Sequence, residues 1–433
     1  MKGEFALFSH ADFSQRLFAR SVRVCQAVVF GCLLVASISC QPSPKKADKN
    51  AANSQRPRVT VDQLRLRDDV LAAAGLETVW NKEILDGPYR RVYVVEDYVF
   101  AVAQSGDRFR LVAHDRASGN NVWTQVLERP PSQPPTIFRY PEGIDAPTEL
   151  FVLLGDKVVC MDLEQGGFPL WEEDLEFPVS SGICAGATHY FVGSYDRRIY
   201  GIPKGEAFPD WSYITNGDVR STGVVDDVNV YFTSTDGNVY RFHEKRGPNG
   251  NEFFAFQTDN DILGSPVAHS RWIYAASTDF KLYALLEIDG GKDWEFQAQA
   301  PILTTPVVGS FATRPRQELL FCISQDDRPR VNKRTLWALN VSTGKRVWKV
   351  DHVAKVLATG RRSVYVLADK RMDRGKILLS LDAKTGRENF HLPLEGFNIL
   401  PSAMGSTPDS MNHTAIIILA HKSGFIQALG EIH

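Results

Sequence analysis

Acidic side chains recur at one place in a repeated sequence pattern. Asp196, Asp236 and Asp279 each follow an apolar run and precede another. Carboxylates that a fold brings together can serve general acid–base catalysis or bind a metal ion. Asp236, however, is followed by Gly237, and Asp and Gly favour the backbone angles of tight hairpin turns. We therefore interpret these residues as turn residues and predict no catalytic or metal-binding role for them.

Histidine and cysteine form no motif for metal binding or nucleophilic catalysis. The sequence has no HxH or HExxH pattern, and no GxSxG, P-loop or GxGxxG motif between a strand and a helix. Cys160, Cys184 and Cys322 are far apart, and each lies in an apolar run. We predict that they are buried thiols rather than disulfide or zinc ligands. We predict no catalytic, cofactor-binding or metal-binding residue and no cofactor.

The composition favours a β-rich globular protein. Of 433 residues, 43% are hydrophobic and 11% are aromatic, with 32 glycines and 23 prolines, as in turn-rich β-folds. The formal net charge of -2 offers no basic field for a phosphate backbone. Nucleic acid is therefore not an expected partner.

Residues 1–40 resemble a bacterial export signal. Arginines precede the apolar run VCQAVVFGCLLVASIS, which is short for a membrane-spanning helix. The end of this run, Ile38-Ser39-Cys40, resembles the lipobox of bacterial lipoproteins, although Ser37 stands where that family usually has Leu. The resemblance implies lipidation at Cys40 and attachment to a membrane. An uncleaved anchor and a plain signal peptide are the alternatives.

The next residues connect this signal to the body. Residues 41–60 are polar and contain prolines, which predicts a flexible tether. Residues 61–77 predict a lead-in with one short amphipathic helix.

From about residue 78 one phrase recurs every 40 to 50 residues, the period of a propeller blade. Each copy has an aromatic residue on an outer strand, a run of small residues expected nearest the axis, and two further apolar strands. Four short strands per repeat indicate one blade. Eight aromatic anchors predict eight blades: Trp80, Trp123, Trp171, Trp211, Phe254, Trp294, Trp348 and Phe390.

Glycine turns and the two ends of the body complete this scheme. Gly119, Gly344 and Gly386 are expected in left-handed turns that join the fourth strand of one blade to the outer strand of the next. The chain ends in the fourth-strand phrase FIQALGEIH, and the body begins with the outer-strand phrase LETVWNKEIL. We predict an all-β fold over residues 78–433, a single eight-bladed β-propeller of four-stranded antiparallel blades. The C-terminal strand would pair with the first blade and close the ring.

The repeated phrase resembles that of the pyrroloquinoline quinone (PQQ)-like β-propellers. It reads LWALNVSTGKRVWKV from Leu336, ILLSLDAKTGRENFHL from Ile377 and LVAHDRASGNNVWTQV from Leu111. The resemblance implies the fold and not the cofactor. Quinoprotein dehydrogenases carry adjacent cysteines, a Glu/Asn/Asp calcium set and often a CxxCH haem motif, and none of these can be matched in this sequence.

The plan of the whole chain also resembles the BamB family, the lipoprotein subunits of the outer-membrane β-barrel assembly machinery. This resemblance implies a non-enzymatic, monomeric scaffold that faces the periplasm, is anchored in the outer membrane and binds the barrel-assembly core protein. The alternatives are a binding propeller of another envelope complex or ligand and, less favoured, a PQQ-dependent dehydrogenase.

Two insertions depart from the repeat and are expected to carry partner contacts. Residues 128–149 are rich in proline, which predicts a surface loop rather than central strands. Residues 326–334 are basic, with Arg314 and Arg316 expected nearby, and such a loop can contact anionic head groups or a partner.

Overall fold

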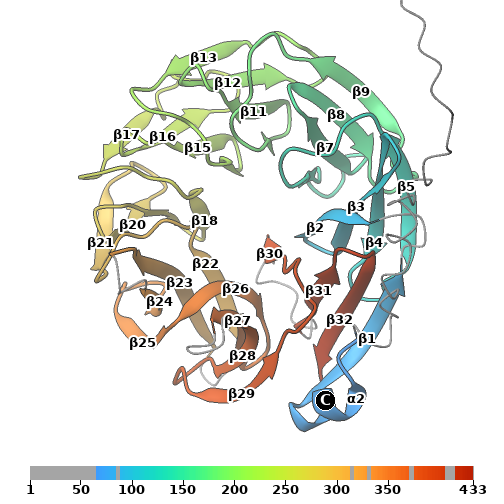
Figure 1. Ribbon diagram of the computed structural model, residues 1–433. Helices are drawn as coiled ribbons and strands as arrows, with labels where there is room; N and C mark the ends of the chain where they lie inside the picture. Colours follow the sequence, from blue (N-terminus) through green and yellow to red (C-terminus); the bar gives the residue numbers. More distant parts are fainter. Residues whose placement is uncertain are drawn as a thin grey trace, which may run out of the picture. The chain divides into compact units, whose positions relative to one another are not determined.

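Eight small β-sheets follow one another around a central axis (Figure 1). This computed structural model describes residues 65–83, 88–312, 316–328, 333–369, 375–404 and 415–432, all within one compact unit, Val59–His433. The export signal, Cys40 and the tether lie outside the described residues. The predicted eight-bladed propeller is confirmed.

We number the sheets as blades 1 to 8 in chain order. Blade 1 contains β2 (Tyr89–Val95), β3 (Tyr98–Ser105), β4 (Arg108–Asp115) and β5 (Asn121–Leu127), and blade 2 contains β6 (Thr136–Phe138), β7 (Glu149–Leu154), β8 (Lys157–Asp162) and β9 (Pro169–Asp174). Blade 3 contains β10 (Cys184–Ala185), β11 (His189–Gly193), β12 (Arg198–Pro203) and β13 (Trp211–Ile214), and blade 4 contains β14 (Val224–Asp226), β15 (Asn229–Thr233), β16 (Asn238–His243) and β17 (Phe254–Gln257).

Blades 5 to 8 follow the same scheme. Blade 5 contains β18 (Val267–His269), β19 (Trp272–Ala276), β20 (Lys281–Leu286) and β21 (Lys292–Gln297), and blade 6 contains β22 (Val307–Phe311), β23 (Gln317–Asp326), β24 (Lys333–Asn340) and β25 (Arg346–Asp351). Blade 7 contains β26 (Val353–Thr359), β27 (Ser363–Asp369), β28 (Lys376–Asp382) and β29 (Glu388–Pro393), and blade 8 contains β31 (Ile417–His421), β32 (Phe425–Glu431) and β1 (Leu76–Glu83). One further strand, β30 (Ala403–Met404), precedes β31, and one helix, α2 (Asp68–Ala73), precedes β1.

Burial along each blade follows from its position in the stack. The second strands β11, β15 and β19 are buried along their whole length, because neighbouring blades cover both faces of the sheet. Outer strands such as β9 and β21 alternate between exposed and half-buried residues, as expected where only one face is covered. The apolar core therefore lies between consecutive blades.

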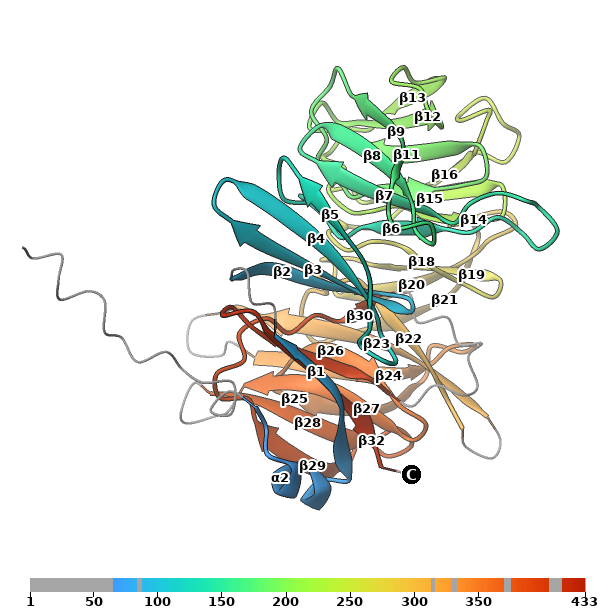
Figure 2. The ribbon, with the colours of Figure 1, turned by 90° about the vertical axis from the view of Figure 1, so that its right-hand side faces the viewer.

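Antiparallel pairing sends the loops to two opposite faces, and the hairpins extend to both sides in the view of Figure 2. We call the upper face the one with the hairpins between second and third strands and the connections between blades. The lower face carries the other hairpins. The turns at Gly119, Gly344 and Gly386 belong to the lower face, and each joins the third and outer strands of one sheet. Our expectation that they join two blades is wrong.

The ring closes through strands from the two ends of the body. Strand β1 pairs antiparallel with β32, with Trp80 opposite Ala428, which confirms the predicted closure. Blade 8 has three strands, because β30 does not pair with β31 but runs parallel to β2 of blade 1. Blade 1 consequently has five strands, and the other six blades among the described residues have four.

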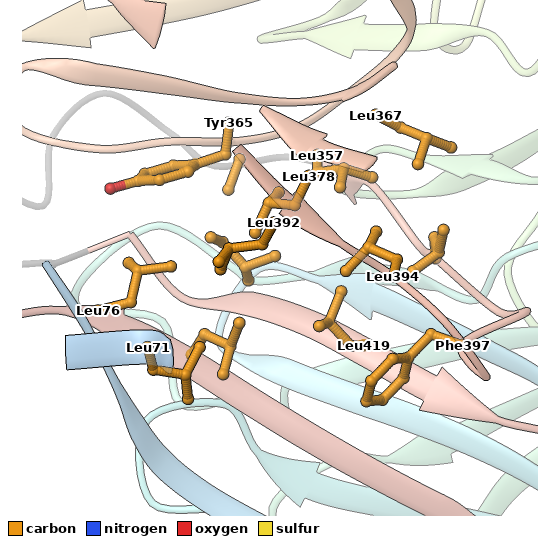
Figure 3. Close-up of a cluster of buried hydrophobic side chains, with 14 of the residues drawn as sticks. Leu71, Leu76, Leu357, Tyr365, Leu367, Leu378, Leu392, Leu394, Phe397 and Leu419 are labelled. Atoms are coloured by element: carbon orange, nitrogen blue, oxygen red, sulfur yellow. The ribbon is translucent and has the colours of Figure 1, made fainter. Parts of the chain in front are cut away.

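Side chains of blades 7 and 8 and of helix α2 pack together at this seam (Figure 3). Leu71 of α2 and Leu76 of β1 are buried against leucines of β26, β28 and β29. Beside them, the fully buried Gln427 accepts a hydrogen bond from the Leu66 N–H at 3.0 Å and donates to the Leu66 carbonyl and to Thr78 Oγ1. One amide thus connects the lead-in, β1 and β32.

An aromatic ring of one blade lies against a turn glycine of the next blade. Gly386 of blade 7 has a φ of +70° and packs on Trp348 of blade 6, whose Nε1 donates to the Ala383 carbonyl at 2.7 Å. The same contact joins Trp80 to Gly119, Trp123 to Gly167, Trp211 to Gly247, Phe254 to Gly290 and Trp294 to Gly344. The repeat therefore spaces aromatics and glycines so that this contact joins consecutive blades at six junctions of the described ring.

Substitution of Gly386 tests this contact. A Cβ there would lie 2.6 Å from Cδ2 of Trp348, whereas a Cβ at Gly106, where φ is +62°, would meet no atom within 4 Å. We expect Gly106→Ala to lower the free energy of unfolding by about 1 kcal/mol through backbone strain alone. Gly386→Ala should lower it by about 3 kcal/mol, since overpacking adds to the strain. Urea unfolding measures both, and equal losses would contradict the role of the contact.

Gln427→Leu tests the seam. The variant leaves the Leu66 N–H and carbonyl without their side-chain partner, and we expect a loss of about 2 kcal/mol in the free energy of unfolding. Hydrogen exchange should accelerate in β1 and β32 before it accelerates in β11, on the far part of the ring. Unchanged exchange at the seam would show that the amide does not support closure.

Candidate functional site

The aromatic anchors predicted from the sequence all lie in outer strands. Trp80 is in β1, and the others are in β5, β9, β13, β17, β21, β25 and β29. Trp80, Trp123, Trp211 and Trp348 are buried, and their indole N–H groups donate to carbonyls of the next blade at 2.7 to 2.8 Å. These residues hold the blades together and do not converge on a site.

The repeated carboxylates lie in separate hairpins of the upper face. Asp236 accepts hydrogen bonds from the Asn238 N–H at 2.9 Å and from the Tyr240 hydroxyl at 2.7 Å. Tyr200 and Tyr283 donate in the same way to Asp196 and Asp279, both at 2.6 Å. Burial and the neighbouring Asp196 raise the pKa of Tyr200 to about 12, so the phenol keeps the proton that it donates. Asp236 and Asp279 also accept hydrogen bonds from the Asn216 and Asp259 N–H groups of the neighbouring connections, so these carboxylates are bound in and beside their own turns.

The three cysteines of the body are free and buried, as predicted. Burial raises the pKa of each thiol far above its usual range, which disfavours the reactive thiolate. Within the described segments, no three His, Cys, Asp or Glu side chains gather as a metal site would require. The helix that the structure describes is too short to cross a membrane, and no other described segment forms a helical span.

The proline-rich insertion at 128–149 is not one surface loop, and our expectation is wrong here. It contains β6, which forms the inner strand of blade 2 and pairs with β7. Its two remaining parts, 128–135 and 139–148, therefore emerge on opposite faces. The density of prolines led us to predict a loop, but the inner strand β6 has only three residues, and the prolines flank it without interrupting it.

A buried ion pair fixes the second of these parts to the ring. Lys204 of blade 3 lies 2.5 Å from Glu149 and donates to the Tyr140 hydroxyl at 3.1 Å. Its ammonium also lies 3.8 Å from the centre of the Phe138 ring. Such a charge is tolerated inside a protein because it is paired and hydrogen-bonded. No local motif signals this cluster, since its members come from two blades.

The basic insertion at 326–334 does not form one patch with Arg316, which also contradicts our expectation. Arg316 precedes β23 and the insertion follows it, so ten residues of extended strand separate them. The described cations of the insertion, moreover, have acidic partners: Arg328 pairs with Asp326, Lys333 with Asp351 and Arg334 with Asp369. Arg314 lies outside the described residues.

The upper face of blades 3 to 5 exposes large apolar side chains. Tyr195 and Phe280 are 63% and 41% exposed and lie in hairpins between second and third strands. Ile214, the last residue of β13, and Leu263, on the connection between blades 4 and 5, are exposed as well. We call these four residues the upper apolar patch. Recognition surfaces of rigid rings commonly lie on such loops.

Backbone strain marks the same hairpins. Phe280 has a φ of +75° and Arg197 a φ of +65°, at the turn position that Gly237 occupies in blade 4 with a φ of +81°. A non-glycine residue in this conformation costs about 1 to 2 kcal/mol. Strain of this kind persists where the surrounding structure requires it and gathers at functional sites. The sequence shows Phe280 and Arg197 after an Asp but does not reveal their exposure.

A cavity of about 540 Å³ lies beside the inner strands β2 and β26. Arg90, Arg91, Lys355 and Lys422 line it together with apolar residues of the connection between blades 7 and 8. None of these residues was singled out from the sequence, because the cavity gathers them from blades 1, 7 and 8.

Comparison with known proteins identifies a family model that matches part of the repeat region. Residues 248–399 match a family model described as outer membrane protein assembly factor BamB. No curated protein matches the chain in sequence. This segment runs from the outer strand of blade 4 through blade 7, where the repeated phrase is most regular.

Solved structures resemble the whole body. BamB from Moraxella catarrhalis is 14% identical, with a TM-score of 0.58 and coverage of 83% of this chain and 98% of that one. A quinohemoprotein alcohol dehydrogenase from Pseudomonas putida HK5 is 9% identical, with a TM-score of 0.56 and coverage of 83% and 76%. The computationally designed Ika8 protein is 10% identical, with a TM-score of 0.52 and coverage of 82% and 99%.

At these identities the likeness shows the fold alone. An assembly factor, a dehydrogenase and a designed protein share it, so the fold does not select a function. The chain is thus an eight-bladed propeller whose residues 248–399 carry the PQQ-like repeat of the BamB family model, which confirms the resemblance inferred from its sequence.

Proposed function

We propose that this chain is a non-enzymatic scaffold of the bacterial cell envelope that acts in outer-membrane protein assembly by binding a protein partner. The match of residues 248–399 to the assembly-factor family carries this proposal. The partner that fits this role is the barrel-assembly core protein. Cys40 would attach the chain by a lipid to the outer membrane, with the propeller facing the periplasm.

The upper apolar patch is the surface that we assign to the partner. Exposed aromatic side chains provide large contact area at low cost in conformational entropy and are enriched among residues that dominate binding energy. The left-handed backbone at Phe280 displays its ring on a short, rigid hairpin. Tyr195 occupies the same hairpin two blades earlier, so one flat partner surface can contact both rings.

Recovery of the partner tests the role. Full-length protein is extracted from membranes under conditions that keep the assembly machinery intact, and co-purifying proteins are quantified by mass spectrometry. We expect the barrel-assembly core protein among them. Its absence would contradict the proposed role, and recovery of a different envelope complex would favour the alternative binding function.

Substitutions in the patch test the surface. Phe280→Gly removes the ring and also relieves the positive φ, so the free energy of unfolding should stay the same or rise. Combined with Tyr195→Ser, it should lower recovery of the partner at least tenfold, as for the loss of two aromatic anchors. Phe208→Ser is the matched control, because Phe208 is 65% exposed on the lower face. Equal recovery with all variants would exclude the patch while leaving the scaffold role in place.

A further inference from the structure

The cavity beside β2 and β26 is cationic. Four of its lining residues are basic, and no lining residue is Asp or Glu; the basic residues are Arg90, Arg91, Lys355 and Lys422. Its volume lies within the range of small-molecule sites, about 300 to 1,000 Å³. The side chains from the connection between blades 7 and 8 are mostly apolar. The cavity thus combines positive charge with an apolar wall.

Irregular strand pairing shapes this cavity. Among the described inner strands that pair with a second strand, β2 and β26 alone show register shifts, at Tyr89/Arg91 and at Val353/Lys355 and Val356/Ala358. The inner strands of blades 2 to 6 pair without a shift. An extra residue in a strand redirects neighbouring side chains and is frequent beside functional sites. The two irregular strands are those that supply Arg90, Arg91 and Lys355.

Lys355 is a half-buried cation, and no carboxylate among the described residues pairs with its ammonium. In the part of the chain that the structure describes, its ammonium has one hydrogen-bond acceptor, the Leu400 carbonyl at 3.1 Å. Burial lowers the pKa of Lys355, and the single carbonyl acceptor supplies no negative charge to offset that burial. A buried charge is costly unless it is paired, and an anion in the cavity would supply the missing charge.

The neighbouring guanidinium groups are held in place. Arg91 donates through one terminal nitrogen to the carbonyls of Pro131 and Ser132, at 2.9 and 2.7 Å, on the connection between blades 1 and 2. Arg90 donates through Nε to Gln104 Oε1 at 2.6 Å. Such contacts fix the direction of each side chain before a ligand arrives, and pre-organised donors lose less entropy on binding.

We propose that this cavity binds a small organic anion, whose carboxylate or phosphate group pairs with Lys355 and Arg91 while Ile399 and Leu400 contact its apolar part. This site goes beyond the proposed scaffold function and does not depend on it. Its residues come from blades 1, 7 and 8, whereas the upper apolar patch lies on blades 3 to 5. Failure of either proposal therefore leaves the other intact.

Calorimetric titration of the purified full-length protein tests the site. Citrate and inorganic phosphate are the probes and glycerol is the neutral control, at low ionic strength because salt screens such attraction. We expect saturable binding of at least one anion and none of glycerol. Lys355→Met and Arg91→Gln should each weaken binding at least tenfold. Lys384→Gln, a cation in an exposed turn of blade 7, should leave it unchanged.

Stability supplies a second readout. Lys355→Met removes a half-buried charge that has no acidic partner among the described residues, so the melting temperature of the unliganded protein should stay the same or rise. A clear fall would identify Lys355 as a structural residue and overturn the proposal. Binding of neither anion, or equal binding by Lys355→Met, Arg91→Gln and the unmodified protein, would overturn it as well.

A third measurement distinguishes a lipid head group from a free anion as the ligand of the cavity. Co-sedimentation uses vesicles of phosphatidylglycerol with phosphatidylcholine, compared with vesicles of phosphatidylcholine alone. Selective sedimentation with the anionic vesicles that Lys355→Met abolishes would assign a lipid head group. Binding of citrate or phosphate without vesicle binding would assign a free anion.

Discussion

The contact between an aromatic ring and the turn glycine of the next blade is the constraint on which the propeller depends. An indole can lie flat on a turn only where no Cβ intervenes, and its N–H can then reach a carbonyl of that turn, as in Trp348 with Gly386 and Ala383. This contact sets how closely consecutive blades approach. It also explains why the sequence repeats one phrase, since a blade that presents both a ring and a glycine can join its two neighbours.

At the seam this contact is replaced by others. Phe390, the aromatic anchor of blade 7, faces the two ends of the body instead of a continuous hairpin, and Gly75 there accepts a hydrogen bond from the Ile432 N–H at 3.0 Å. The leucine cluster around α2 and the amide of Gln427 take over the joining role. The same region of the ring carries the one exchange of a strand, in which β30 pairs with β2 of blade 1 among the described residues.

Those features of the fold that recur in every blade could be predicted from the repeated sequence phrase. Aromatic spacing indicated the number of blades, and the end phrases indicated the closure, because both depend on local pattern. The glycine that each ring contacts could not be predicted, because ring and glycine belong to different blades and the repeat does not mark the boundary between blades. Trp294, for example, contacts Gly344 of the next blade. The same holds for β6 between prolines and for the shifts in β2 and β26, which tertiary packing decides. The cationic cavity lies beside the shifted strands, whereas the upper apolar patch lies on repeated hairpins whose individual side chains the repeat does not fix.

A regular ring therefore serves as a frame, and function is expected at side chains of its loops and cavities that the repeat does not specify. Site-specific photocrosslinking in intact cells tests this most directly, with a benzophenone amino acid in place of Phe280 or, as the lower-face control, of Phe208. The account predicts a crosslink to the barrel-assembly core protein from position 280 and none from position 208. A crosslink from position 208 alone, or to no component of that machinery from either position, would contradict it.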